Sequence, residues 1–269
     1  MQELFISSRK NETLREAAKL LVSGEVRREK GLFLAEGARL CRDAVRSGIT
    51  VKELFYTQSA GEKYPEYIME LREKAEKVFC LADHAGELLS GTKNTQGIFC
   101  VCSAGEREKK EIPYNHCLAL ENVQDPGNLG TVLRTAEALG VGSVLLCGAC
   151  CDVFSPKVLR ASMGAVFRLP VFFFPSLPAA VAGLGLKGFQ TFAAVPESDA
   201  FPVTEADFSH PTLMAVGNEG SGLSREAKEC CGRKITIPML GRAESLNAAA
   251  SASILMWEMM RGGAPHGAG

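Results

Sequence analysis

The chain has 269 residues, of which 46% are apolar and 23% are charged, and its formal net charge is −1. These values are typical of a globular protein that can bury a core in one large domain or in two smaller ones. No apolar run approaches the roughly 20 residues that span a bilayer, and charges interrupt the first twenty residues. We therefore expect a cytoplasmic protein without a membrane segment. The balanced charge neither supports nor excludes RNA binding.

The cysteines predict neither a disulfide framework nor a metal site. Ten cysteines in a chain of this length are too few for a disulfide scaffold. Cys150 and Cys151, like Cys230 and Cys231, are adjacent pairs, which suit neither a bridge nor a chelate. The one C-x-x-C, which begins at Cys147, has no second pair or histidine cluster to complete a zinc site. We expect reduced, mostly buried thiols and no metal.

The first hundred residues predict a small α/β module. A helix is expected after Asn11, which can cap it, and Gly31 is expected to end it. A strand, a glycine and a second helix follow in "LFLAEGARLCRDAVRSG", and "VKELFYT" and "KVFCLA" predict further strands with a helix between them. The charged stretch that follows predicts a linker at 106–113. The domains are therefore expected at 1–105 and 114–263, with a disordered tail at 264–269.

Basic and amide side chains are frequent in this module. Taken by themselves they indicate a solvated helix face, because acidic residues are interleaved with them. The residues in question are Arg9, Lys10, Arg27, Arg28, Lys30, Lys93 and Asn94.

After the linker, apolar strands alternate with helices. The strands are expected in "CLALENV", "GSVLLC", "RLPVFFF", "QTFAAV", "TLMAVG" and "KITIPM", and the last helix at 245–261. This alternation predicts a parallel sheet that is covered on both faces. In such sheets, ligands bind beyond the carboxyl ends of the strands. The loops that follow the strands are therefore where a site is expected.

The loop "QDPGNLG" follows the first of these strands. Pro126 and the glycines favour a tight turn, and Asn128 can cap a helix expected from about Thr131 to Leu139. Arg134 would then lie near the helix start, where its charge opposes the helix dipole. Such a position favours anion binding, but an ion pair with Glu137 accounts for it equally well.

Two later loops are also unusual. "GNEGSGLS" places glycines around Glu219, which lets backbone approach a flat ligand, but it lacks the lysine of a P-loop. "LGRAESLN" ends in Ser245 and Asn247, which can cap the last helix or orient a ligand. The alanines and serines that follow allow close packing, either beneath a threaded loop or at a dimer interface.

The three loops, in this order, resemble the three signature motifs of the SpoU (TrmH-like) branch of the SPOUT RNA methyltransferases. "NVQDPGNLGTVLRTAEALG" is similar to motif 1, "LMAVGNEGSGLS" to motif 2 and "ITIPMLGRAESLNAAASASILMWE" to motif 3. The first region resembles the ribosomal-protein-like substrate-binding domain of this family through "FLAEGARL" and "TQGI". The resemblance implies an α/β protein with a C-terminal parallel-sheet domain that contains a trefoil knot, and a smaller N-terminal α/β RNA-binding domain.

The resemblance also implies an activity and a set of site residues. The family transfers a methyl group from S-adenosylmethionine (AdoMet) to a ribose 2′-hydroxyl of structured RNA, as a homodimer. Carried over by position, the catalytic residues are Asn128, Arg134, Glu219, Ser245 and Asn247. The cofactor-binding residues are Gly217, Ile237, Met239, Gly241 and Leu246, and the RNA-binding residues are Arg9, Lys10, Arg28, Lys93 and Asn94. A guanidinium stays protonated, so we expect Arg134 to clamp the attacking oxygen and the adjacent phosphate.

Three alternatives accompany this interpretation. Ribosomal RNA is the preferred substrate because the leading domain resembles one found in rRNA-directed members, and transfer RNA is the alternative. A non-catalytic RNA-binding relative would be expected to lose Asn128, Arg134, Glu219 or Asn247, and all four are present. A dinucleotide-dependent enzyme would need a glycine-rich loop with other spacing than "DPGNLG".

Overall fold

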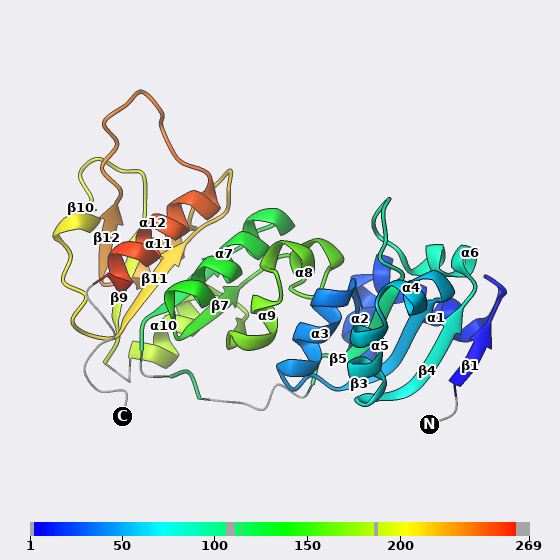
Figure 1. Ribbon diagram of the computed structural model, residues 1–269. Coiled ribbons are helices and arrows are strands. Elements are labelled where there is room, and N and C mark those ends of the chain that lie inside the picture. The colour runs from blue at the N-terminus through cyan, green and yellow to red at the C-terminus, as the bar shows by residue number, and fades with distance from the viewer. Residues whose placement is uncertain (1–2, 106–110, 114, 186–187, 262–269) are drawn as a thin grey trace. The chain divides into compact units, whose positions relative to one another are not determined.

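The structure is a computed structural model that describes residues 3–105, 111–113, 115–185 and 188–261 (Figure 1). It forms two compact units. Unit 1 comprises Met1–Lys110 and Asp152–Phe167, and unit 2 comprises Glu111–Cys151 and Arg168–Gly269. Residues 106–110 of the predicted linker and the whole predicted tail at 264–269 lie outside the described residues.

Unit 1 is built on a five-stranded mixed sheet with the strand order β1-β4-β3-β5-β2. Strands β1, β4 and β3 pair in parallel, whereas β5 pairs antiparallel with both β3 and β2. The strands are β1 (Glu3–Ile6), β2 (Leu32–Glu36), β3 (Val51–Thr57), β4 (Ala75–Leu81) and β5 (Ile98–Ser103). The helices are α1 (Glu12–Val22), α2 (Gly24–Lys30), α3 (Ala38–Arg46), α4 (Gln58–Lys63), α5 (Pro65–Arg72), α6 (Asp83–Gly86), the 3-10 helix η1 (Glu87–Leu89), α8 (Pro156–Ser162) and α9 (Ala165–Arg168).

The helix expected between Asn11 and Gly31 is two helices. The Asn11 side chain accepts a hydrogen bond from the Leu14 amide, and Gly31 ends α2 with a φ of 60°, as predicted. Between them, Ser23 ends α1 in an extended conformation and its hydroxyl caps α2 through the Val26 amide. A serine favours such a cap, because its side chain competes with the helix for backbone donors.

A segment from the second half of the sequence completes the core of unit 1. Phe154 stacks on Phe33 with 4.5 Å between the ring centroids, and Phe167 lies 5.7 Å from the same ring. The guanidinium of Arg27, which is almost fully buried, donates to the Asp152 carboxylate at 2.6 Å. Residues 152–167 lie within the predicted range 114–263, yet they pack in unit 1.

Unit 2 contains the predicted parallel sheet. Its seven strands follow the order β10-β12-β9-β11-β6-β7-β8, and all their pairings are parallel. The strands are β6 (Cys117–Glu121), β7 (Ser143–Cys147), β8 (Val171–Phe174), β9 (Gln190–Ala194), β10 (Phe201–Pro202), β11 (Thr212–Val216) and β12 (Arg233–Thr236). The helices are α7 (Pro126–Leu139), α10 (Leu177–Gly185), the 3-10 helix η2 (Val203–Glu205), α11 (Arg225–Cys230) and α12 (Ala248–Met260).

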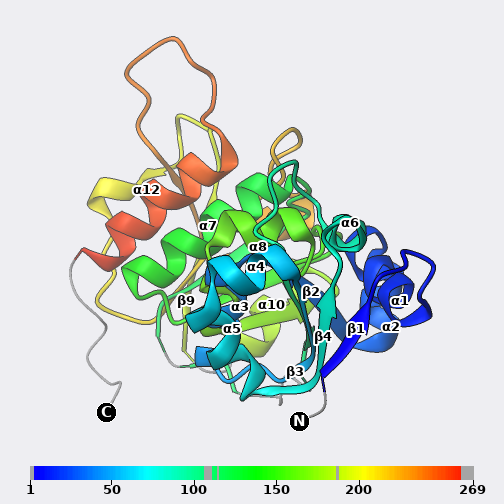
Figure 2. The ribbon, with the colours of Figure 1, turned by 45° about the vertical axis from the view of Figure 1, so that its right-hand side comes forward.

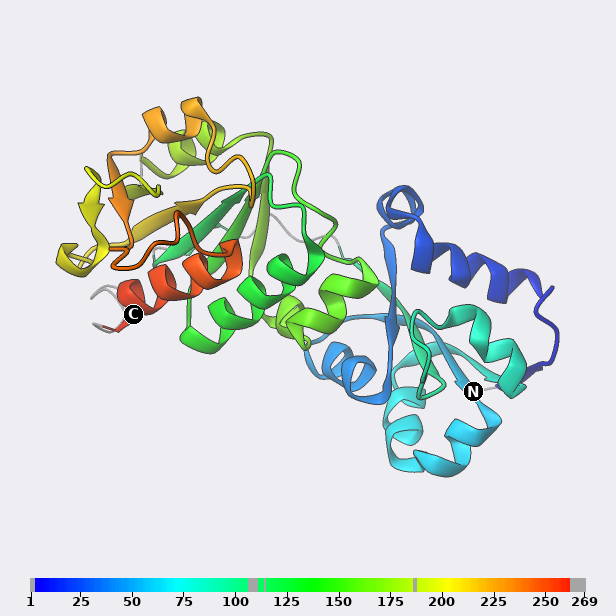
Figure 3. The same cartoon turned by 90° about the horizontal axis from the view of Figure 1, so that it is seen from above.

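Helices cover both faces of this sheet, as the sequence predicted. Helices α7 and α12 pack side by side on one face (Figure 2), while α10 and α11 pack against each other on the opposite face (Figure 3). Strands β6, β7 and β11 are buried along their whole length, which is why they read as continuous apolar runs. The predicted fold class is confirmed. Among the described helices, none has the length and apolar character needed to cross a bilayer.

Candidate functional site

The three motif loops leave the same edge of the parallel sheet. The segment 122–125 follows β6, residues 217–224 follow β11, and residues 237–247 follow β12. Strand β11 is hydrogen-bonded to β6 in the sheet, and only β9 separates it from β12. In Figure 1 the chain after β12, drawn in orange, rises beyond the end of the sheet before it enters α12. All three motifs therefore lie at the carboxyl ends of the strands, where the sequence predicted a ligand site.

The helix after the first motif begins earlier than predicted. Asp125, not Asn128, is the N-cap of α7, and its side chain accepts from the Asn128 amide at 2.7 Å. Pro126 opens the helix, where its missing N–H and fixed φ are tolerated. Arg134 consequently lies more than two turns inside α7. The prediction that Arg134 opposes the dipole at a helix start is therefore wrong.

The Glu219 carboxylate joins the second motif to the first. It accepts hydrogen bonds from the Asn128 side-chain amide at 3.0 Å and from the backbone amides of Asp125 and Gln124 at 3.3 and 3.4 Å. Burial would raise the pKa of Glu219, but hydrogen bonds from Asn128 and from the backbone lower its pKa overall. Glu219 is therefore a carboxylate at neutral pH and organises the turn before α7.

Asn128 extends this connection to the third motif. Its Oδ1 accepts from Asn247 Nδ2 at 3.0 Å, while its own Nδ2 donates to Glu219. The Oδ1 of Asn247 caps α12 by accepting from the Ala249 and Ala250 amides. In each of these two side chains the amide nitrogen donates a hydrogen bond and the amide oxygen accepts one or more, so the orientation of both amides is fixed. We call the series Glu219–Asn128–Asn247 the carboxylate–amide chain.

Three further polar residues hold the second loop, and sequence reasoning missed them. The side chain of Asn218 donates to the Asn122 backbone oxygen at 2.9 Å. The buried carboxylate of Glu121 accepts from the Ser224 amide and hydroxyl at 2.8 and 3.0 Å, at the N-cap of α11. Polar residues that directly follow an apolar strand, as in "LALEN", were the available signal.

Arg134 projects from an exposed position of α7. Within the described part of the chain, its guanidinium has no hydrogen-bond or ion-pair partner. Glu137, the alternative partner considered from the sequence, instead pairs with Arg168 at 2.7 Å. The ion-pair explanation of Arg134 therefore does not hold in this structure, and its donors are available to a ligand.

A cavity of about 270 Å³ lies between the second and third motif loops. Of the predicted cofactor residues, Gly217, Ile237, Met239 and Leu246 line it, and Gly241 does not. Glu219 and Ser245, predicted as catalytic, also line it, whereas Asn128, Arg134 and Asn247 do not. The wall formed by Ala194, Val195, Pro196 and Thr236 was not predicted, because these residues carry no distinctive motif.

Gly217 permits the second loop to close on itself. A Cβ atom at this position would lie 2.1 Å from the Gly222 carbonyl carbon and 2.2 Å from the Leu223 nitrogen. Asn218 and Gly222 exchange both backbone hydrogen bonds across this closure. From the sequence we expected the glycines of this loop to let backbone approach a ligand closely. In the structure, the backbone of Gly222 and Leu223 occupies the space that a side chain at position 217 would need.

The predicted RNA-binding residues lie at three places in unit 1. Arg9 and Lys10 are in the turn after β1, Arg28 is on α2, and Lys93 and Asn94 are in the loop between η1 and β5. Arg9 donates to the His84 carbonyl oxygen and forms an ion pair with Glu87, so part of its charge is already compensated. No described contact brings the three places together.

The cysteines are free thiols in this structure, and several are buried. Burial raises the pKa of Cys151 and of Cys231 to about 12, which keeps both protonated at neutral pH. Among the described residues, no group of His, Cys, Asp and Glu side chains is arranged to hold a metal ion.

Comparison with known proteins gives matches along most of the chain. Residues 115–257 match the SpoU rRNA Methylase family, and residues 11–100 match the MRM3-like substrate binding domain. The Bacillus subtilis 23S rRNA (guanosine(2553)-2′-O)-methyltransferase RlmP is 32% identical over 254 residues, covering 94% of this chain and 98% of that protein.

Two solved structures are similar over nearly the whole chain. The SpoU methyltransferase AviRb from Streptomyces viridochromogenes, in complex with AdoMet, has a TM-score of 0.84 and 26% identity, and the match covers 94% of this chain and 98% of that one. The AdoMet-bound rRNA methyltransferase from Sinorhizobium meliloti has a TM-score of 0.87 and 27% identity, with 97% and 99% covered.

Proposed function

Because the chain belongs to the SpoU rRNA methylase family, as its motifs indicated, we propose that it methylates a ribose 2′-hydroxyl of ribosomal RNA. AdoMet is the methyl donor in this family's reaction, and both similar solved structures described above contain it. The match of residues 11–100 to a substrate-binding domain supports an RNA substrate that is held by unit 1. Cytoplasmic localisation is part of the same proposal.

The observation that carries the proposal is the carboxylate–amide chain beside the cavity. It joins all three motif loops through hydrogen bonds between polar side chains. The cavity is lined by the polar loop of residues 217–222 and has apolar walls from Ile237, Leu246 and Leu255. Flat, partly apolar ligands such as an adenosyl group need this combination of surfaces. The described residues therefore fit AdoMet.

Arg134 and the carboxylate–amide chain would have different roles in the reaction. Bound AdoMet supplies an electrophilic methyl group. Arg134 holds the attacking ribose oxygen and an adjacent phosphate with its planar set of donors, which aligns the displacement. Asn128 and Asn247 keep the start of α7 and the start of α12 in fixed register, so that Arg134 and the cavity keep their spacing.

The proton of the 2′-hydroxyl needs an acceptor other than these residues. Arg134 stays protonated, and the Glu219 oxygens already accept from Asn128 and two backbone amides. The lowered pKa of Glu219 also makes it a weak base. We propose that a phosphate oxygen of the RNA or a water molecule takes the proton.

A homodimer is the assembly that we propose for this activity. Ala250, Ile254 and Trp257 form an exposed apolar stripe along α12, at spacings that share one helix face. Helix α7 packs beside α12 and carries Arg134 at an exposed position. A partner that covers the stripe would therefore approach Arg134 as well, which fits a site completed by two copies.

The test is a methylation assay with tritiated AdoMet and separate pools of unmodified rRNA and tRNA. Label in rRNA that survives alkali as a dinucleotide would establish 2′-O-methylation of the proposed substrate. Label in tRNA alone would replace the substrate and leave the reaction intact. Failure of the protein to bind AdoMet in calorimetry would contradict the proposal as a whole.

A further inference from the structure

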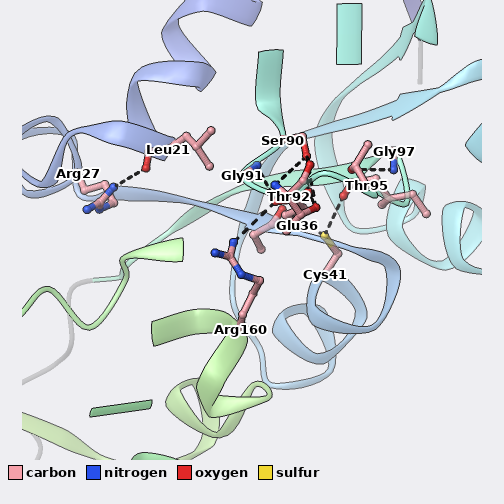
Figure 4. Close-up of polar contacts among 12 residues, drawn as sticks. Leu21, Arg27, Glu36, Cys41, Ser90, Gly91, Thr92, Thr95, Gly97 and Arg160 are labelled. Carbon is pink, nitrogen blue, oxygen red and sulfur yellow. Dashed lines mark hydrogen bonds and ion pairs between the residues drawn. The ribbon is translucent and has the colours of Figure 1, made fainter. Parts of the chain in front are cut away.

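The loop between η1 and β5 in unit 1, residues 90–97, is fastened at both ends around an exposed tip. We call it the 90–97 loop. Its sequence, "SGTKNTQG", contains two of the predicted RNA-binding residues, Lys93 and Asn94. The polar contacts that hold its first end are shown in Figure 4. They centre on one acidic residue for which the proposed reaction has no use.

That residue is Glu36, the last residue of β2. Only 7% of its side chain is exposed, and its carboxylate accepts three hydrogen bonds from the start of the 90–97 loop. The Ser90 hydroxyl donates at 2.8 Å, the Gly91 amide at 2.9 Å and the Thr92 hydroxyl at 2.9 Å. A buried carboxylate that accepts three donors holds them strongly, because leaving any of these groups unpaired would carry a desolvation penalty.

Among the described residues, Arg160 is the cation that faces this carboxylate. Arg160 Nη1, on α8 in the same unit, lies 3.9 Å from Glu36 Oε2, which is an ion-pair distance but too long for a hydrogen bond. The three donors from the loop are therefore the direct partners of Glu36. Arg160 reduces the penalty of burying the negative charge without competing for the same geometry.

The far end of the loop is fastened independently. Gln96 Oε1 accepts from the Ala38 amide at 2.9 Å, at the start of α3, and the Gly97 oxygen accepts from the Thr57 amide at 2.8 Å. Gly97 has a φ of 69°, and a Cβ there would lie 2.3 Å from Thr57 Oγ1. This end therefore requires a glycine and is fixed to α3 and β3.

Between the two fastened ends, the tip presents free polar groups. Lys93 and Asn94 are exposed, and among the described residues their side chains have no hydrogen-bond or ion-pair partner. An ammonium and an amide in this arrangement suit phosphate and ribose or base-edge contacts in RNA. The polar groups at both ends of the loop hydrogen-bond to the protein, whereas the Lys93 and Asn94 side chains remain available to a ligand.

We propose that Glu36 is a positioning residue for RNA binding: it holds Ser90, Gly91 and Thr92 so that Lys93 and Asn94 meet the RNA in one preformed arrangement. This inference rests on the proposed function, which supplies the RNA. According to this inference, a buried negative charge favours the binding of a polyanion. Preformed loops bind more tightly because less ordering remains to be done on binding.

Whether Glu36→Gln strengthens or weakens RNA binding distinguishes a positioning role of Glu36 from a role of its charge alone. If Glu36 acted only through its charge, Glu36→Gln would strengthen RNA binding, because a negative charge near phosphate is removed. If Glu36 positions the loop, the same change weakens binding, because an amide nitrogen then replaces one of the two oxygens that accept the three hydrogen bonds. We expect roughly a three- to tenfold rise in the Kd for rRNA, the size of effect produced by one or two extra side chains to be ordered.

The experiment measures rRNA affinity by filter binding on the full-length protein for Glu36→Gln, Lys93→Ala and the double variant. If positioning is correct, the effect of Glu36→Gln largely disappears when Lys93 is already alanine, because the two changes act through one contact. Glu62→Gln, an exposed acid of α4 in the same unit, is the charge-matched control and should leave affinity unchanged or slightly higher.

Two outcomes would overturn the inference. One is tighter RNA binding by Glu36→Gln, and the other is full additivity with Lys93→Ala. Thermal melting and AdoMet calorimetry on the same variants identify a general loss of folding, and Thr92→Val removes a single donor as a milder version of the same change. AdoMet-dependent labelling at saturating rRNA tests the proposed function separately, because it should persist in Glu36→Gln if only affinity is altered.

Discussion

Arg134 lies at an exposed position in the middle of α7, and among the described residues its guanidinium has no hydrogen-bond or ion-pair partner. We expect Arg134→Ala to lower kcat for RNA methylation by roughly 10²- to 10³-fold, the usual effect of removing one donor that stabilises developing charge. AdoMet affinity should be unchanged, because Arg134 does not line the cavity. Single-turnover assays with labelled AdoMet, together with calorimetry, measure the two quantities.

Arg134→Lys and Arg225→Ala are the matched variants for that measurement. Lysine keeps the charge but loses the planar set of donors, so it should recover only part of the rate. Arg225 is an exposed arginine of α11 that pairs with Glu229, and its removal should have no effect on the rate. Near-normal turnover by Arg134→Ala would contradict the proposed clamp.

His116 gives a prediction about acid stability that is independent of catalysis. It is fully buried immediately before β6, and within the described residues neither ring nitrogen has a hydrogen-bond partner. Burial lowers the pKa of His116, so the folded protein favours the neutral ring. Its contribution to stability is complete above the unfolded pKa of about 6.5 and is lost as the pH falls through the folded pKa.

We therefore expect the melting temperature to fall less between pH 7.5 and pH 5.5 in His116→Leu than in the wild type. Leucine cannot take up a proton and leaves no unpaired nitrogen in the core. His210→Gln, a change at an exposed histidine, should keep the pH dependence of the wild type. Equal losses in the wild type and His116→Leu would show that other groups set the acid limit.

The sequence indicated which side chains matter better than it indicated what each side chain contacts. Asn128, Glu219 and Asn247 stood out because amides and acids interrupt glycine-rich loops between apolar elements. Their mutual hydrogen bonds join residues about 90 to 120 positions apart. Such pairings follow from strand order in the sheet, which no local pattern encodes. The roles assigned to these residues stay predictions.

At the scale of elements, α12 presents an apolar stripe that a single copy of the chain leaves exposed. Trp257 is 57% exposed and Ile254 is 38% exposed. We expect Ile254→Glu combined with Trp257→Glu to give a monomer in sedimentation velocity at micromolar concentration, because two charges would have to be buried in the proposed interface. Methylation should fall with dimer content.

Phe173 supplies the control for that experiment. It lies on β8, at the edge of the parallel sheet, and is 58% exposed. Phe173→Glu therefore adds a charge at an equally exposed apolar position away from α12, and we expect it to leave the oligomeric state unchanged. A wild-type protein that is monomeric and fully active would contradict the composite site.

Element boundaries were predictable where capping residues mark them and wrong where tertiary contacts decide. Asn11 and Gly31 mark helix ends that the structure has. The start of α7 was predicted at about Thr131 with Asn128 as a possible cap, yet Asp125 caps it and the helix begins at Pro126. Strand β1 has only four residues and was not predicted. Its pairing with β4 is what defines it.

At the scale of the whole molecule, unit 1 uses chain from both halves of the sequence. We expect a fragment of residues 1–105 to unfold at least several degrees lower than the same fragment joined by a glycine–serine linker to residues 152–167. The fragment lacks Phe154 and Phe167 against Phe33, and losing one such aromatic contact costs a few kcal/mol. Circular dichroism melts of the two proteins measure the difference.

Equal stability of the two proteins would show that other residues of the shorter fragment bury Phe33 when Phe154 and Phe167 are absent. Binding of a hydrophobic dye by the shorter fragment, and not by the joined one, would identify the exposed ring face directly. The domain boundaries drawn from the sequence stay a prediction until such fragments are compared. The knot implied by the family resemblance likewise stays a prediction.

The ion pair between Arg27 and Asp152 has a consequence for how this gene can change. Its two residues lie 125 positions apart in the sequence, yet each compensates the charge of the other in a largely buried environment. Recombination at the linker would transfer Arg27 without its acid and leave a buried positive charge uncompensated. Lineages that exchange the RNA-binding half must therefore inherit, or evolve again, a compatible Asp152 segment in the other half.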